Sequence, residues 1–176
     1  MDTALLVDPI FKLHDTGAGH PECAARYDSI TTALERTDLI HRLPKIPLRD
    51  ATDDEIALVH PRAYIDTVRM DIQKGAHDLS TGDTAVCKDS WNVAVKAVGG
   101  ILNAVDKIMS GDVNHAFCAV RPPGHHATPT RGMGFCIFNN VAIAARYVQK
   151  KYSAERVLIA DWDVHHGNGT QDAFYT

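Results

Sequence analysis

The sequence predicts an α/β fold in which a parallel β-sheet is flanked by helices on both faces. Short runs that are apolar throughout, such as "ALLVD" and "RVLIAD", alternate with longer segments of helical periodicity. Strands that are apolar on both sides are typical of parallel sheets buried between layers of helices. Acidic residues and histidine pairs follow two of these runs, where the carboxyl ends of parallel strands gather functional groups.

Bulk composition predicts one domain over residues 1–176. The chain is 45% hydrophobic and 23% charged, which is enough for one core. A net charge of −4 argues against a nucleic-acid partner. No apolar run is long enough to span a membrane, and the start of the chain lacks the features of a signal peptide. Four scattered cysteines without a Cys-x-x-Cys pair predict reduced thiols in a cytoplasmic protein.

Three apolar runs predict buried strands, and six segments predict helices. The strands are residues 4–8, 115–120 and 156–161, and the helices are residues 20–37, 52–60, 61–70, 90–111, 139–152 and 170–176. Pro21 fits a first helical turn, and Thr52 with Glu55 forms a capping box. We expect Pro61 to end or bend the helix that precedes it.

Helix ends in the second half of the chain carry their own signals. Gly111 is a plausible C-terminal cap for residues 90–111. Asn139 or Asn140 can cap the helix that follows them, and Thr170 can cap the last one.

The stretch "DWDVHHGNGTQ" combines two acids with two histidines. In an extended strand Asp161, Asp163 and His165 share one face, and His166 points to the other. A carboxylate and an imidazole two residues apart can bind one cation, and these donors suit Zn²⁺, Fe²⁺ or Co²⁺. The alternative is a surface turn with solvated acids and a histidine.

A second pair, His125 and His126, follows a Pro-Pro-Gly break. The prolines stiffen the backbone, and two imidazoles near a metal could activate water and protonate a leaving group. Each ring needs an orienting acceptor on its other nitrogen, for which Asp161 and Asn168 are the candidates. Otherwise the pair only caps its loop.

The glycine-rich turn "RGMGFC" presents one aromatic side chain. Gly132 and Gly134 flank Met133, and Phe135 follows. Phe135 could form the wall of a narrow apolar channel, or it could be an ordinary core residue.

Together, "RPPGHHA", "GFCIFNN" and "DWDVHHGNGTQ" in this order resemble the zinc-dependent histone deacetylases and their bacterial amidohydrolase relatives. "HDTGAGHPECAAR" resembles the opening loop of that family. The last motif looks like the class II branch, because class I usually has Asp at the position of Asn168. The resemblance runs from about Leu6 onward and implies an arginase/deacetylase-like fold. It also implies that the chain is the N-terminal part of the deacetylase domain, incomplete at its C-terminus.

The resemblance implies two metal sites. Asp163 and His165 match two of three zinc ligands, and Asp161 matches a contributor to a potassium site. The third zinc ligand and the catalytic tyrosine of the family lie later, and neither Asp172 nor Tyr175 matches them. We therefore expect weak zinc binding and little activity from this chain alone.

The histidine pair and its acceptors also match family residues. His126 matches the general base, and His125 matches its partner. Asp161 matches the acid that accepts a hydrogen bond from His125, and Asn168 matches the acceptor for His126.

Three further residues match the substrate-binding part of the family. Gly134 and Phe135 match the channel around the acyl-lysine stem, and Asp83 matches, more loosely, the rim acid that holds the substrate backbone. The implied activity is removal of acetyl groups from Nε-acetyl-lysine of proteins by metal-activated water. The alternatives are an amidohydrolase acting on acetylated polyamines or other small amides, and a non-catalytic remnant that binds an acyl group or a partner.

Overall fold

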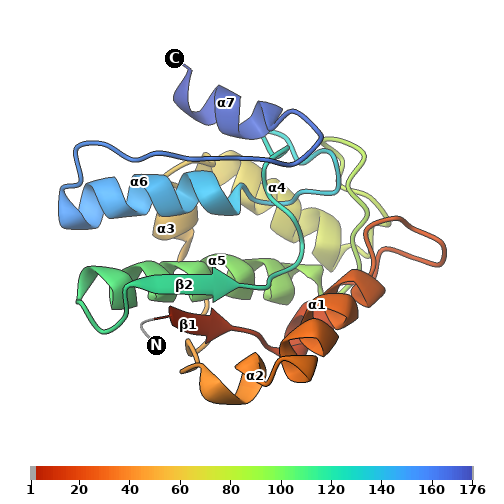
Figure 1. Ribbon diagram of the computed structural model, residues 1–176. Coiled ribbons are helices and arrows are strands. Elements are labelled where there is room, and N and C mark those ends of the chain that lie inside the picture. Colours follow the sequence, from red (N-terminus) through yellow and green to blue (C-terminus); the bar gives the residue numbers. More distant parts are fainter. Residues whose placement is uncertain (1–2, 176) are drawn as a thin grey trace.

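A computed structural model of the chain describes residues 3–175. The elements in chain order are β1 (Thr3–Leu6), the 3₁₀ helix η1 (Pro9–Lys12), α1 (Ala24–Arg36), α2 (Leu39–Arg42), α3 (Asp53–Ile56), α4 (Arg62–Gln73), α5 (Ser90–Met109), β2 (His115–Cys118), α6 (Asn140–Tyr152) and α7 (Asn168–Phe174) (Figure 1). Helices and parallel strands thus occur in one chain, which confirms the predicted α/β class.

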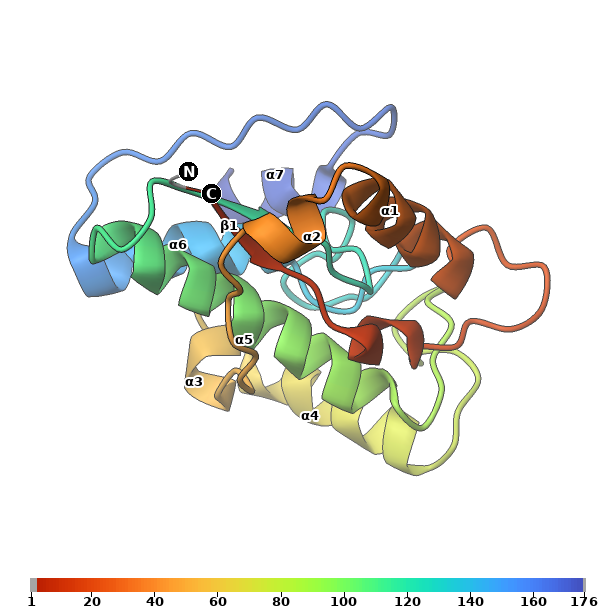
Figure 2. The ribbon, with the colours of Figure 1, turned by 60° about the horizontal axis from the view of Figure 1, so that its bottom comes forward.

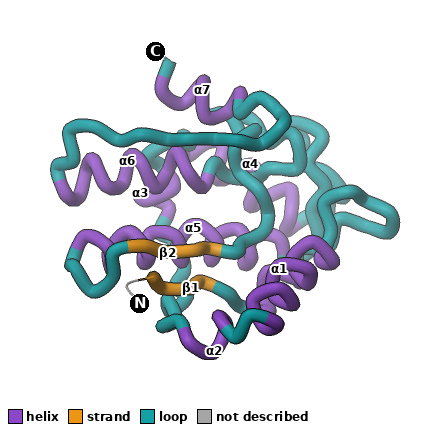
Figure 3. The backbone as a smooth tube through the Cα atoms, viewed as in Figure 1, coloured by secondary structure: helices purple, strands orange, loops and turns teal. Residues whose placement is uncertain are grey.

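Strands β1 and β2 lie side by side and run parallel, with Thr3 opposite His115 and Leu6 opposite Cys118 (Figure 3). A parallel pair needs a long crossover connection, and here α5 forms its last part. Ala104 of α5 packs in the same cluster as Leu6 of β1. One side of α5 therefore covers the strands.

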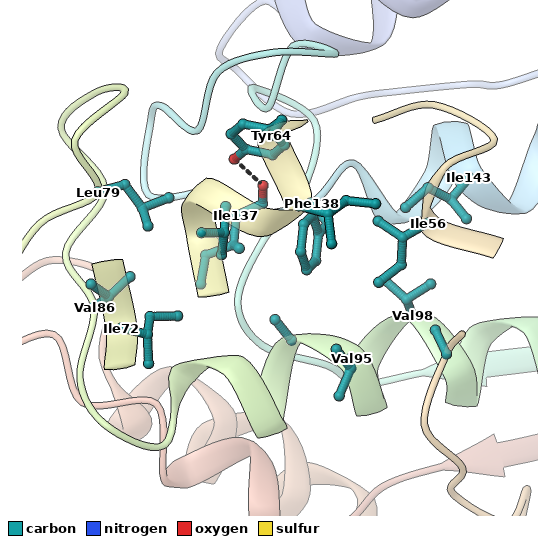
Figure 4. Close-up of a cluster of buried hydrophobic side chains, with 14 of the residues drawn as sticks. Ile56, Tyr64, Ile72, Leu79, Val86, Val95, Val98, Ile137, Phe138 and Ile143 are labelled. Carbon is teal, nitrogen blue, oxygen red and sulfur yellow. Dashed lines mark hydrogen bonds between the residues drawn. The ribbon is translucent and has the colours of Figure 1, made fainter. Parts of the chain in front are cut away.

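The main hydrophobic core lies between α5 and the helices on its other side (Figures 2 and 4). Val95 and Val98 of α5 belong to one buried cluster with Ile65 of α4 and Ile143 of α6. Phe138, from the loop that precedes α6, is also buried there. The end of that loop is therefore fixed in the core.

Local chemistry predicted several helix ends correctly. The Thr52 hydroxyl accepts a hydrogen bond from the Glu55 amide, and the Glu55 carboxylate accepts one from the Thr52 amide, so the capping box is confirmed. Asn139 caps α6 because its side chain accepts a hydrogen bond from the backbone amide of Ala142, the third residue of the helix. Gly111 follows α5 with a φ of 82°, as a glycine C-terminal cap requires.

Two predicted starts and one predicted end are wrong. Helix α1 begins at Ala24 after the N-cap Cys23, so Pro21 lies outside it, and Glu22 forms a tertiary ion pair instead. Helix α7 begins at Asn168 after the N-cap Gly167, so Thr170 lies inside it. The backbone amide of Thr170 donates to the carbonyl of His125, and this hydrogen bond fixes the helix to a distant loop. The α-helix that the capping box starts ends at Ile56, before Pro61.

The predicted buried strand at residues 156–161 is also wrong for the part of the chain that the structure describes. Figure 1 shows residues 153–167 crossing the molecule as a long uncoiled segment between α6 and α7. Leu158 in this segment is 90% exposed. The predicted strand at 115–120 does form, but Phe117 is 48% exposed. An apolar run becomes a buried strand only if a neighbouring strand supplies hydrogen bonds, and among the described residues no strand pairs with residues 156–161.

All four cysteines (Cys23, Cys87, Cys118 and Cys136) are free in the structure. Among residues 3–175, no helix combines the length and the apolar character that crossing a membrane would need.

Candidate active site

Two segments meet to form the candidate site. His125 and His126 lie in the loop after β2, and the acidic stretch lies just before α7. The Thr170 amide donates to the carbonyl of His125 at 3.1 Å. A Cβ atom on Gly169 would lie only 2.3 Å from the carbonyl oxygen of Ala127, so a glycine is needed for this close approach.

Each histidine of the pair is hydrogen-bonded to the acceptor named from the sequence. Nδ1 of His125 lies 2.8 Å from Oδ2 of Asp161, and Nδ1 of His126 lies 2.7 Å from Oδ1 of Asn168. The two ring centroids are 4.1 Å apart. An amide oxygen can only accept, so His126 donates its Nδ1–H, and the lone pair of the neutral ring is then on Nε2. These hydrogen bonds confirm the two pairings, and the catalytic roles stay predictions.

The surroundings of Asp161 favour its ionised form, which strengthens the contact with His125. The hydrogen bond from His125 lowers the pKa of the Asp161 carboxyl, and the backbone amide of Asp163 contributes in the same direction. An ionised Asp161 holds the Nδ1–H of His125 and leaves the Nε2 of that ring as the second proton-transfer position.

Asp163 and His165 bring an oxygen and a nitrogen donor together. Oδ1 of Asp163 lies 3.0 Å from Nδ1 of His165 and also accepts from the His165 amide at 2.8 Å. These contacts lower the pKa of Asp163, first through the amide and then through the ring. The His165 ring centroid is 6.0 Å from that of His126. The two donors therefore adjoin the histidine pair.

This donor set fits part of a zinc site. Zinc takes carboxylate oxygen and imidazole nitrogen, usually from three protein side chains when the site is catalytic. Within residues 3–175, no group of three or more histidine, cysteine, aspartate or glutamate side chains is arranged to hold a metal. Asp163 and His165 thus offer two of the donors that such a site needs.

Beside the histidine pair, the Gly134–Phe135 turn has an unusual backbone. Gly134 has a φ of 55°, and a Cβ there would lie 2.4 Å from Cδ2 of His126. Phe135 also has a positive φ, 67°. Its ring is partly exposed, unlike the core residues that follow it, and contacts His20 edge-on with centroids 4.5 Å apart. Phe135 is therefore not a core residue.

Asp83 lies at the same turn. Its Oδ1 accepts a hydrogen bond from the backbone amide of Gly134 at 3.0 Å. The structure thus brings all three residues matched to substrate binding, Asp83, Gly134 and Phe135, to one place next to His126.

Sequence reasoning missed a buried ion pair behind the site. Nε and Nη2 of Arg121 donate to the two carboxylate oxygens of Glu22 at 2.6 and 2.7 Å, and Nη1 donates to the carbonyl of Phe11. Arg121 opens the loop that carries the histidine pair, and Glu22 stands in the "HPECAAR" motif. Both residues lie in motifs that were singled out, but nothing in the sequence pairs them.

Comparison with known proteins places this arrangement in one class. Residues 20–176 match the family described as the histone deacetylase domain. Histone deacetylase 6 of Caenorhabditis elegans is 42% identical over 165 residues, covering 89% of this chain and 17% of that protein. Polyamine deacetylase HDAC10 of Danio rerio is 40% identical over 147 residues, covering 81% of this chain and 22% of that protein.

A solved structure, the HD domain of HDA15, matches with a TM-score of 0.91 at 37% identity. The match covers 98% of this chain and 50% of that one, so the chain spans about half of the solved domain and a smaller share of these two relatives. The fold and the matched residues show that the chain belongs to the histone deacetylase family.

Proposed function

We propose that the full-length protein is a zinc-dependent amide hydrolase that removes acetyl groups from Nε-acetyl-lysine side chains of proteins. The observation that carries the proposal is the hydrogen-bonded pair of His125 and His126 beside the donors of Asp163 and His165. Family membership supports the same reaction.

Asp163 and His165 would hold the zinc ion, with a third ligand from outside residues 3–175. When bound, zinc supplies Lewis-acid chemistry that polarises a substrate carbonyl and lowers the pKa of water toward about 7. A potassium ion would bind near Asp161. The two carboxylate oxygens of Asp161 also accept hydrogen bonds from His125 and from the Asp163 amide.

The histidine pair would move the protons. His126 takes a proton from the attacking water at Nε2, because its Nδ1–H is engaged by Asn168. His125 acts as its partner, and the carboxylate of Asp161 stabilises positive charge on the His125 ring. The aliphatic stem of the substrate lysine would lie against Gly134 and Phe135, with Asp83 near the substrate backbone.

Activity and metal content of the full-length protein test the proposal together. His126→Ala should lower kcat on an acetyl-lysine peptide by at least about 100-fold, the range of a lost general base. Asp163→Asn should lower both activity and zinc content measured by mass spectrometry. His166→Ala is the matched control, because the exposed His166 bonds Gln171 instead of joining the pair, and it should stay active. A well-folded wild-type protein without zinc or activity would favour a non-catalytic remnant.

Acetylated polyamines are a second candidate substrate class, favoured by the 40% identity to a relative named as a polyamine deacetylase. Comparing kcat/KM on an acetyl-lysine peptide and on acetylspermidine decides between them. Free cysteines support the proposed cytoplasmic location, and imaging of the tagged protein tests it.

A further inference from the structure

The turn beside His126 has a backbone that must be held in place. Gly134 and Phe135 both have positive φ, 55° and 67°. Glycine tolerates this region, but a phenylalanine rarely adopts it. The Cys136 amide closes the turn by donating to the carbonyl of Met133 at 3.0 Å, and a phenylalanine stays in this region only where surrounding structure helps to impose it. The neighbouring groups that contact the turn therefore help to decide its conformation.

A neighbouring loop contacts the turn through three side chains. The hydroxyl of Thr81 accepts from the Gly132 amide at 3.2 Å, and Oδ1 of Asp83 accepts from the Gly134 amide at 3.0 Å. The hydroxyl of Thr84 donates to the carbonyl of Cys136 at 3.2 Å. Side chains of the loop thus form hydrogen bonds with every second residue of the turn, namely Gly132, Gly134 and Cys136. A neighbouring β-strand would form the same pattern with its backbone.

The loop and the turn also touch through their backbones. A Cβ on Gly82 would lie 2.0 Å from the carbonyl oxygen of Gly132. Both partners are anchored in the core, because Leu79 is buried there and the Tyr64 hydroxyl donates to the carbonyl of Ile137 at 2.7 Å (Figure 4). The loop (residues 79–84) and the turn (residues 132–136) are therefore each attached to the hydrophobic core.

Asp83 accepts its hydrogen bond from Gly134, the first of the two residues with positive φ. It is exposed, and among the described residues its side chain accepts only the hydrogen bond from Gly134. A charged acceptor forms a stronger hydrogen bond than a hydroxyl does. Of the three contacts, the one at Asp83 is thus the best placed to hold Gly134 and Phe135.

We propose that Asp83 is a positioning residue, which holds the Gly134–Phe135 turn against His126 through Oδ1. The carboxylate thereby fixes this wall of the channel beside His126. The catalytic consequence rests on the proposed function, whereas the contact with the turn does not.

Hydrogen exchange of the full-length protein tests the contact without any substrate. Asp83→Ala should raise the exchange rate of one amide, in peptides spanning residues 132–136, by about tenfold or more. Asp83→Asn should leave that rate near wild type, because its amide oxygen still accepts. Ser80→Ala is the matched control, since Ser80 lies in the same loop but bonds Asp71. Unchanged exchange in Asp83→Ala would overturn the proposal, and unchanged exchange in α5 peptides shows that the variant is folded.

A small substrate separates positioning from rim binding. An acetylated alkylamine has the acyl-lysine stem but no peptide backbone, so a residue that only holds the backbone cannot affect its turnover. Asp83→Ala should still lower kcat/KM on this substrate about tenfold, and Asp83→Asn should restore it. Wild-type turnover by Asp83→Ala would overturn the positioning role. If the wild type has no activity while the exchange result holds, the proposed function fails and the contact stands.

Discussion

The ion pair between Glu22 and Arg121 should be among the most costly contacts of this chain to break. Glu22 is 2% exposed and Arg121 is 4% exposed, and the guanidinium makes two hydrogen bonds to the carboxylate. Glu22→Ala leaves a buried charge that keeps only its bond to the carbonyl of Phe11. Removing one partner of such a pair costs about 3–5 kcal/mol. The exposed pair of Lys12 and Asp28 is the control, worth about 0–1 kcal/mol.

Urea unfolding followed by circular dichroism measures the difference. With a slope of about 2 kcal/mol per molar urea, Glu22→Ala should lower the midpoint by about 1.5–2.5 M, and Lys12→Ala by less than about 0.5 M. The double variant Glu22→Leu with Arg121→Met should recover most of the loss, because no uncompensated charge remains. A loss below about 1 kcal/mol in Glu22→Ala, or a double variant as unstable as the sum of its single changes, would refute the reasoning.

Three further predictions concern pH and the site. Burial lowers the pKa of His60 from 6.5 to about 4. As the pH falls, this imidazole is therefore protonated in the unfolded chain before it is protonated in the folded protein. Protonation of His60 alone should lower the free energy of unfolding by up to about 3 kcal/mol between pH 6.5 and 4, and urea midpoints of the wild type and of His60→Gln will show this contribution. Gly134→Ala should lower kcat at least about tenfold by displacing the His126 ring, whereas Gly17→Ala, with open space around it, should not. Asn168→Asp should move the acidic limb of the pH–rate profile to higher pH, because a carboxylate stabilises imidazolium, and an unmoved limb would contradict this.

The sequence predicted those features whose cause is local. Thr52 caps a helix because Glu55 is three residues away, and Asn139 caps α6 for a similar reason. The alternation of apolar runs and helices was enough for the α/β class. The pairing of His126 with Asn168 came from motifs, and the structure agrees.

Features that depend on distant partners could not be read in this way. Glu22 and Arg121 are 99 residues apart, and an acid near a helix start is ordinarily a surface residue. The run at residues 156–161 has the composition of a buried strand, but a strand also needs a hydrogen-bonded neighbour, which composition does not report. Leu158 is 90% exposed for that reason.

The two halves of the candidate site are held differently. The histidine loop is fixed at both ends by buried residues, Arg121 at its start and Asn139 at its end. The backbone amide of Asn139 donates a hydrogen bond to Nε2 of His60. The half with the proposed metal ligands, Asp163 and His165, lies on an exposed segment, where Trp162 is 95% exposed. Asp161 joins the halves, because Oδ2 accepts from His125 and Oδ1 accepts from the Asp163 amide. The histidine loop therefore fixes the exposed segment through Asp161, and the positions of Asp163 and His165 depend on that contact.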